Sequence, residues 1–253
     1  MRTGNEYKMK VSGVYKGIFP IWQWCRIPGT TAELNEAATT LTNYLEGTND
    51  FGGGLSHYDD GIIAYEHDYN SVQAKKAYIF MNNQMICLGA GIYATKSNEI
   101  ITSVDQARSS SAISYNNGAT TQTFAADSLT ANTFTWVHHN NIGYIFPQGG
   151  LVTLLNKVQS GSWSDINSGG STSVLSDTVF STYFRHSSTP SNRHYYYIVT
   201  PDVPLSSMDS LYNNNNYAFP RNEADIQAVR YDGANKNMQW YSTLREVLTW
   251  EME

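Results

Sequence analysis

The sequence predicts an all-β protein, and three observations lead to that fold class. Short runs of β-branched and aromatic residues recur along the 253 residues, separated by Gly, Asn, Asp and Ser. Charged residues make up only 15% of the chain, whereas Gly (19) and Tyr (18) are abundant, which favours strands and turns. Few segments carry helix signals. Closely spaced short strands indicate an antiparallel sandwich rather than parallel β-α-β units.

Three hairpins are predicted, each from two strand-like runs on either side of a turn. They are 76–80 with 84–88 around Asn82-Asn83, 133–138 with 142–146 around 139–141, and 226–231 with 237–241 around Asp232-Gly233. Further strands are expected from four runs rich in Val, Leu, Phe and Tyr. These runs are 151–155, 173–176, 179–184 and 195–199.

Helix is expected in two places only. Residues 30–36 begin with a capping-type Thr-Thr pair, and residues 206–212 have room for a turn or two before an Asn-rich run. The glycine- and serine-rich stretch 161–173 is expected to be a loop. Trp22 and Trp24 are expected on one face of an extended segment, where packing is favoured over sugar stacking.

Charge and cysteine content exclude several classes of protein. The formal net charge of −6, without a Lys/Arg run, argues against nucleic acid as a partner. No apolar run approaches the roughly 18 residues of a membrane span, and residues 1–6 do not resemble a signal peptide. The two cysteines, Cys25 and Cys87, are expected to be buried free thiols.

Five short motifs occur in an order that is typical of one family. They are FPIWQWCRIPGTT at 19–31, ICLGAGI at 86–92, WVHH at 136–139, GYIFP at 143–147 and GSWSDIN at 161–167. Together they resemble the central β-domain of polysaccharide lyase family 8, the group of chondroitin AC, hyaluronate and xanthan lyases. The resemblance implies a large antiparallel super-sandwich, similar to the galactose-mutarotase-like fold, with few short helices.

The resemblance also implies that residues 1–253 form one β-sandwich domain of a longer lyase. Its N-terminal α/α-toroid would precede the chain, and a smaller C-terminal β-domain would follow. Residues 244–253, which carry Leu, Val and Trp without a stop signal, agree with that expectation. Such an enzyme would be secreted or periplasmic, with its signal peptide upstream. Its partners would be an acidic polysaccharide and the helical domain of the same protein.

Members of the family cleave uronic-acid polysaccharides by β-elimination. This reaction needs a donor that neutralises the uronate carboxylate, together with a base and an acid such as Tyr or His. In the family these groups lie on the helical domain, so no catalytic residue is assigned in this chain. Glu6 is the acidic residue nearest to a supporting Glu of the family, and it is interpreted as a different position.

Four residues are candidates for contact with the polysaccharide. Asn49 and Phe51 belong to a segment expected to be a variable loop beside the glycan cleft, and His57 follows it in a polar cluster after three glycines. Aromatic and amide groups suit sugar stacking and hydroxyl hydrogen bonds. Arg26 is expected either to pair with a carboxylate inside the domain, which is favoured, or to face the cleft.

Alternative chemistries have weaker support in the sequence. His138 and His139 are neighbours on an expected strand, so their side chains would point to opposite faces and would not bind one zinc ion together. There is no Gly-x-Ser-x-Gly elbow for a Ser-His-Asp hydrolase. No cofactor is expected, and a structural cation stays an open alternative. The alternative function is a stand-alone carbohydrate-binding module that has kept the fold without the catalytic part of the enzyme.

Overall fold

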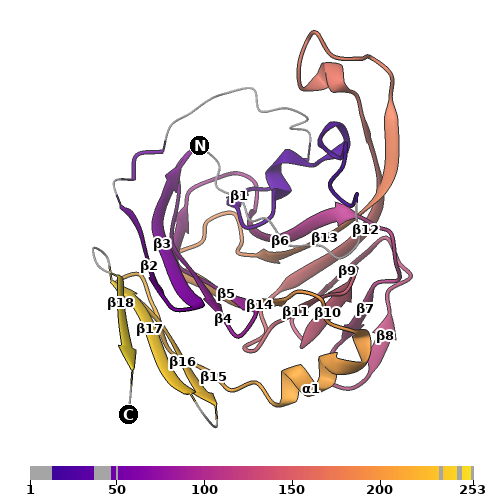
Figure 1. The fold of residues 1–253 in the computed structure, drawn as a ribbon. Coiled ribbons are helices and arrows are strands. Elements are labelled where there is room, and N and C mark those ends of the chain that lie inside the picture. Colours follow the sequence, from indigo (N-terminus) through magenta and orange to yellow (C-terminus); the bar gives the residue numbers. More distant parts are fainter. Residues whose placement is uncertain (1–12, 37–46, 50, 234–235, 244–246, 252–253) are drawn as a thin grey trace.

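The computed structural model describes residues 13–36, 47–49, 51–233, 236–243 and 247–251. The described residues form three antiparallel sheets stacked as layers, with five, nine and four strands. Figure 1 shows the nine-stranded sheet curving through the middle of the molecule, between the other two. This arrangement confirms the all-β super-sandwich class. Helices are few and short among these residues, and none is long and apolar enough to cross a membrane.

The five-stranded sheet consists, in spatial order, of β1 (Thr31–Glu33), β6 (Ile100–Arg108), β13 (Leu175–Arg185), β12 (Val152–Gly161) and β9 (Ser128–Ala131). The nine-stranded sheet follows the order β2 (Gly52–His57), β3 (Asp60–Tyr69), β4 (Val72–Met81), β5 (Gln84–Ala94), β14 (Arg193–Thr200), β11 (Ile142–Ile145), β10 (Trp136–His139), β7 (Ser114–Asn116) and β8 (Thr121–Thr123). The four-stranded sheet is β15 (Tyr217–Asn222), β16 (Ile226–Gly233), β17 (Lys236–Thr243) and β18 (Val247–Glu251).

The helical segments are four 3₁₀ turns and one α-helix among the described residues. They are η1 (Phe19–Ile21), η2 (Trp24–Arg26), η3 (Trp163–Asp165), η4 (Leu205–Ser207) and α1 (Met208–Asn213). The helix expected at 206–212 is therefore confirmed. We call residues 13–33, which contain η1, η2 and β1, the N-terminal strap, because they lie along the five-stranded sheet (Figure 1).

Both faces of the nine-stranded sheet are covered, so two hydrophobic cores form. On one face Tyr78 and Cys87 pack with Phe180 of the five-stranded sheet. On the other face Ile79 and Ile86 pack with residues of the four-stranded sheet and with α1. Because neighbouring strand residues point to opposite faces, a strand between two cores needs an unbroken apolar run, as β5 has.

Local turn chemistry predicted two hairpins correctly. Asn82 and Asn83 both adopt positive φ and join β4 to β5, as the left-handed positions of a two-residue hairpin turn require. Asn140 and Asn141 do the same between β10 and β11, although the strand begins at Trp136 rather than at residue 133.

Cys25 and Cys87 are buried free thiols, as predicted.

The helix expected at residues 30–36 is wrong. Thr31–Glu33 is strand β1, which pairs with β6. The buried hydroxyl groups of Thr31 and Thr102 lie 2.8 Å apart and are hydrogen bonded. Pairing with an open sheet edge satisfies the backbone of this segment, and it outweighs a capping signal that acts only locally.

Other boundaries also differ from the sequence prediction. Asp232 and Gly233 are the last two residues of β16 and do not form the expected turn. Residues 175–176 and 179–184 of the two predicted runs belong to one strand, β13, because they pair continuously with β12, whereas Ser173 and Val174 precede that strand. Trp22 and Trp24 lie in a segment with two 3₁₀ turns rather than in an extended one, yet their rings are 5.8 Å apart. Within the tail, Val247–Glu251 forms strand β18 and pairs with β17, whereas residues 244–246 and 252–253 lie outside the described part of the chain.

The hairpin of β12 and β13 extends well beyond the body of the sandwich, at the upper right of Figure 1. We call residues 157–178, which include η3, the arm. A capping box stabilises η3: the Ser162 side chain accepts from the Asp165 N–H, and the Asp165 carboxylate accepts from the Ser162 N–H. The Gly-Ser-Trp-Ser-Asp motif thus encodes a fixed turn rather than an unstructured loop.

Gly89→Ala should destabilise the fold strongly. A Cβ atom at this position would lie 2.0 Å from the Tyr195 ring on the neighbouring strand, so the ring must move inside a close-packed core. We expect a loss of about 3 kcal/mol in the free energy of unfolding, measured by urea denaturation. Gly52→Ala is the matched control, because its Cβ would meet only Tyr65 at an ordinary 3.8 Å. Equal effects of the two substitutions would contradict this account.

Candidate functional site

A single residue in the strap, Gly29, joins two sheets through the backbone groups on either side of its Cα atom. The Gly29 N–H donates to the Ser103 carbonyl of β6 at 2.8 Å. The Gly29 carbonyl accepts from Lys76 Nζ and from the Tyr78 hydroxyl, both on β4. Lys76 is 1% exposed, and its ammonium nitrogen also lies 5.8 Å from the centre of the Tyr195 ring. A buried cation therefore holds the strap against the nine-stranded sheet.

Burial shifts the pKa values of the groups around this junction. It lowers the pKa of Lys76 to about 7 and raises that of the Cys87 thiol to about 12. Burial, reinforced by the Lys76 charge, lowers the pKa of His67 to about 4 and that of His186 to about 3. His186 lies within 2.9 Å of the Thr102 hydroxyl. These shifts follow from removal of the groups from water, and they describe a structural interior.

The strap is further fixed to β6 by side-chain hydrogen bonds. The Tyr15 hydroxyl donates to Asp105 at 2.9 Å, and Tyr144 from the opposite sheet donates to the same carboxylate. Trp22 Nε1 donates to the Gln106 carbonyl at 3.3 Å. Burial raises the pKa of Asp105 to about 6 despite the two hydroxyl donors. Asp105 therefore connects the strap to both layers.

Arg26, the last residue of η2 in the strap, is buried and does not face an open cleft. It is 3% exposed, its guanidinium pairs with Glu36 at 2.6 Å, and it lies 5.9 Å from the centre of the Tyr183 ring. This is the internal pairing that the sequence favoured.

Asn49 and Phe51 lie just before β2, which begins at Gly52. Asn49 is exposed, and the preceding Thr48 N–H donates to the Asp68 carbonyl at 3.1 Å. Phe51 is half-buried against the core between the nine- and four-stranded sheets. It also lines a narrow pocket with room for about one water molecule.

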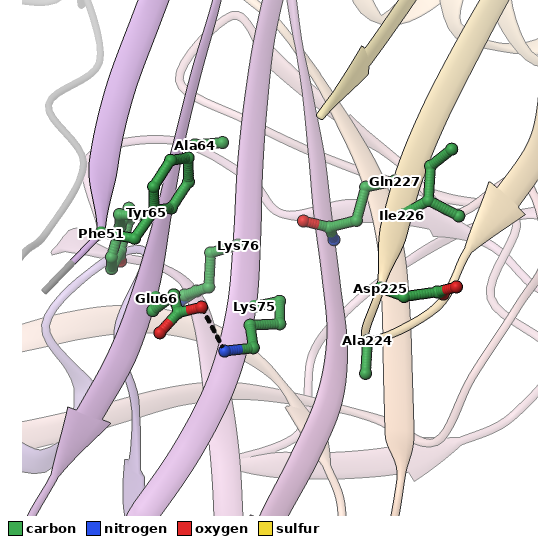
Figure 2. Close-up of a pocket in the computed structure, with 10 residues that line it drawn as sticks. All are labelled: Phe51, Ala64, Tyr65, Glu66, Lys75, Lys76, Ala224, Asp225, Ile226 and Gln227. Carbon is green, nitrogen blue, oxygen red and sulfur yellow. Dashed lines mark ion pairs between the residues drawn. The ribbon is translucent and has the colours of Figure 1, made fainter. Parts of the chain in front are cut away.

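Figure 2 shows this pocket, with Phe51 and Tyr65 on one side and Ala224–Gln227 on the other. The ion pair between Glu66 and Lys75, 2.6 Å long, lies between the two sides. The pocket is too small for a sugar ring, so only its outer rim, including Phe51, is suited to a polysaccharide.

His57 is separated from these two residues by the length of a strand. The segment expected to be a loop after the glycines is strand β2, and His57 is its last residue. Six residues of strand span roughly 20 Å. The structure therefore brings Asn49 and Phe51 together and leaves His57 and Arg26 apart from them. The His57 ring packs edge-on against Tyr58, with ring centres 4.4 Å apart.

The strap carries an aromatic cluster next to the arm. The rings of Phe19 and Trp22 are 5.2 Å apart, and those of Phe19 and Trp24 are 6.1 Å apart. Phe19 is 44% exposed. The strap lies so close to the arm that a Cβ atom on Gly161 would be 1.9 Å from the Pro20 carbonyl oxygen. The strap and the base of the arm thus form one continuous surface.

Sequence reasoning missed Lys76, although the sequence carries a signal for it. Val72, Ala74, Lys76 and Tyr78 alternate along β4, and all four are buried on one face. A lysine at the third inward position of such a strand must bring its ammonium to a buried acceptor. As for metals, the described part of the chain holds no group of three or more His, Cys, Asp or Glu side chains arranged to bind an ion.

The chain matches a known family over most of its length. The family model for the super-sandwich domain of polysaccharide lyase family 8 matches residues 3–212. Among curated proteins, chondroitinase-AC of Pedobacter heparinus is 34% identical over 217 residues, which cover 85% of this chain and 31% of that protein. A hyaluronate lyase of Thermasporomyces composti is 27% identical over 191 residues, which cover 73% of this chain and 25% of that protein.

Solved structures agree with this match. A chondroitinase AC lyase, whose structure was determined in complexes with oligosaccharides, superposes with a TM-score of 0.80 at 31% identity. That superposition covers 91% of this chain and 34% of the other. A Paenibacillus xanthan lyase superposes with a TM-score of 0.77 at 25% identity, covering 88% of this chain and 23% of the other. The chain spans about a third or less of the length of the curated relatives that it matches.

Lys76→Met should change how stability depends on pH. Unfolded lysine has a pKa of 10.5, whereas that of Lys76 in the fold is about 7, so from pH 7 upward the unfolded chain binds more protons. The free energy of unfolding of the wild type should therefore rise, relative to Lys76→Met, by about 2 kcal/mol between pH 7 and pH 9. Urea denaturation at several pH values measures this difference. Lys75→Met, at a partly exposed position, is the control, and its difference from the wild type in free energy of unfolding should not grow with pH. If the difference between the wild type and Lys76→Met does not change with pH, the Lys76 ammonium is not buried.

Proposed function

Because the chain belongs to polysaccharide lyase family 8, we propose that it is the central domain of an enzyme that cleaves uronic-acid polysaccharides by β-elimination. In this proposal it supports a catalytic helical domain and forms one side of the glycan cleft. The relatives named as chondroitinase, hyaluronate lyase and xanthan lyase support the substrate class. Secretion or a periplasmic location is part of the proposal, because a polysaccharide does not cross a membrane unaided.

The observation that carries the scaffolding role is the apolar character of the arm. Val158 is 69% exposed and Val174 is 73% exposed, and both lie where a solvated hairpin would carry polar residues. Trp163, Ile166 and Leu175 on the same arm are also exposed, each by more than a third. A concentration of apolar side chains on a projecting hairpin is typical of a surface that another domain covers. The arm and the adjacent Phe19 would form the contact with the helical domain.

The described residues support a binding role better than a catalytic one. The groups whose pKa values burial shifts most lie in the interior, where they hold the strap in place. A base that removes a proton from a uronate ring must instead reach the polymer directly. We therefore assign proton transfer to the helical domain. In this proposal Asn49 and the exposed edge of the Phe51 ring contact the polysaccharide. Arg26 holds the strap in position.

A lyase assay on this chain tests the proposal. The isolated domain should fold and yield no unsaturated uronate, followed by ultraviolet absorbance, with chondroitin, hyaluronan or xanthan. The complete enzyme that contains the domain should be active on at least one of the three. Turnover by the isolated chain would mean that a complete catalytic site lies within these residues. Tight binding of these polymers to the isolated chain would favour the rival, a stand-alone carbohydrate-binding module.

The arm can be tested with Val158→Ser combined with Val174→Ser. Because both side chains are mostly exposed, the unfolding midpoint of the isolated domain should change little. In the complete enzyme the same pair should lower the thermal midpoint and the activity, since a buried contact is lost. Leu205→Ser, at an exposed position away from the arm, is the control. An unchanged complete enzyme would remove the arm from the interdomain contact.

Phe51→Leu should weaken substrate binding without loss of the fold. Leucine keeps the apolar contact with the core but cannot stack on a sugar ring. In the complete enzyme we expect KM to rise about fivefold, with the thermal midpoint within a few degrees of wild type. Steady-state kinetics and thermal unfolding measure both quantities. If KM stays unchanged in Phe51→Leu and in Phe51→Ala, Phe51 does not contact the substrate.

A further inference from the structure

A second group of exposed apolar side chains lies far from the arm. It surrounds the tight turn between β2 and β3, which Figure 1 places across the molecule from the arm. Tyr58 in that turn is 93% exposed, Ile63 is 50% exposed and Phe80 is 41% exposed. These side chains border an open, shallow hollow of about 480 Å³. We call Ser56, Tyr58, Asp59, Ile63 and Phe80 the tip surface.

Tyr58 occupies a backbone position that other hairpins of this chain give to asparagine. It has a φ of 52°, in the left-handed region that a bulky side chain disfavours. The tight turns at 70–71, 82–83 and 140–141 each begin with Asn at a φ of 52°. The geometry of the turn therefore does not explain the tyrosine, and the core does not explain it either, because the ring is in water.

The sheet leaves space beside the tyrosine. Ser56 pairs with Gly61, and Gly61 pairs in turn with Phe80 on the next strand. Because residues opposite each other in a ladder share a face, Ser56 and Phe80 flank a glycine that has no side chain to fill the gap. The His57 ring braces Tyr58 edge-on, with 4.4 Å between ring centres. The result is a shallow floor with aromatic groups and a hydroxyl group around it.

The charge of the tip surface selects the kind of ligand. The described residues that line the hollow include Asp59 and Asp60, and none of them is lysine or arginine. An exposed carboxylate accepts hydrogen bonds from sugar hydroxyls and repels the carboxylate or sulfate groups of an acidic polymer. An aromatic ring packs on the apolar C–H face of a pyranose.

We propose that the tip surface binds uncharged hexopyranose units of a polysaccharide, at a site separate from the cleft for the acidic substrate. The sugar ring packs on Tyr58 and Phe80, and its hydroxyls donate to Asp59 and exchange hydrogen bonds with Ser56. The site tethers the protein to neutral glycan that surrounds the acidic substrate. It goes beyond the proposed function, and it does not require that this chain belongs to an active lyase.

Three substitutions test the site on the chain as it stands. Tyr58→Asn replaces the strained residue with the one that the other turns use, so it should raise the unfolding midpoint while binding falls about tenfold or more. Tyr58→Phe keeps the ring and should keep affinity within about threefold. Tyr93→Asn removes a half-exposed tyrosine elsewhere and is the matched control, with unchanged binding.

Binding is measured by titration calorimetry with cello-, manno- and galacto-oligosaccharides at millimolar concentration, and with a chondroitin oligosaccharide for comparison. Binding of at least one neutral oligosaccharide that Tyr58→Asn weakens supports the proposal. It is overturned if none of the neutral oligosaccharides binds, if Tyr58→Asn binds as well as wild type, or if chondroitin binds more tightly at this surface. Concentration-dependent dimers that Tyr58→Asn abolishes would show that a second copy of the chain covers the surface instead.

Discussion

The architecture depends on the two backbone polar groups of Gly29. Its φ of +77° is open to glycine at little cost, and this conformation directs the N–H toward β6 and the carbonyl toward β4. A buried ammonium is costly unless its hydrogen bonds are satisfied, so Lys76 fixes the position of this carbonyl. The strap, held in place at Gly29, closes one side of the sandwich. Its aromatic cluster lies against the base of the arm.

How far the sequence predicts this structure depends on how local each signal is. The Asn82-Asn83 and Asn140-Asn141 turns encode their own backbone geometry, so both hairpins were predicted correctly. Strand β1 was mistaken for a helix because its stability comes from β6, about 70 residues away in sequence. Strand β2 was not predicted, because its glycines suit a strand only when a partner strand supplies the pairing.

The candidate sites follow the same division. The segment of Asn49 and Phe51 was expected to be a loop beside the glycan cleft, and the structure shows that it precedes the edge strand β2. The sequence could not show that His57 lies at the far end of that strand. The strain at Tyr58 depends on a φ angle, and the exposure of Val158 and Val174 depends on how far β12 and β13 extend past the sheet. Residue identity alone predicts neither property, because both depend on the register in which neighbouring strands pair.

Electrostatics explains why binding and catalysis would be divided between domains. A net charge of −6 repels a polyanion at long range, so this chain alone is poorly suited to attract the acidic substrate that its relatives cleave. The contacts proposed for Asn49 and Phe51 would be short-range and neutral, so they would not depend on long-range attraction. An uncharged glycan experiences no such repulsion, and a carboxylate such as Asp59 becomes a useful acceptor for it. The negative charge that leaves capture of the acidic substrate to another domain therefore favours neutral sugar at the other end of strand β2.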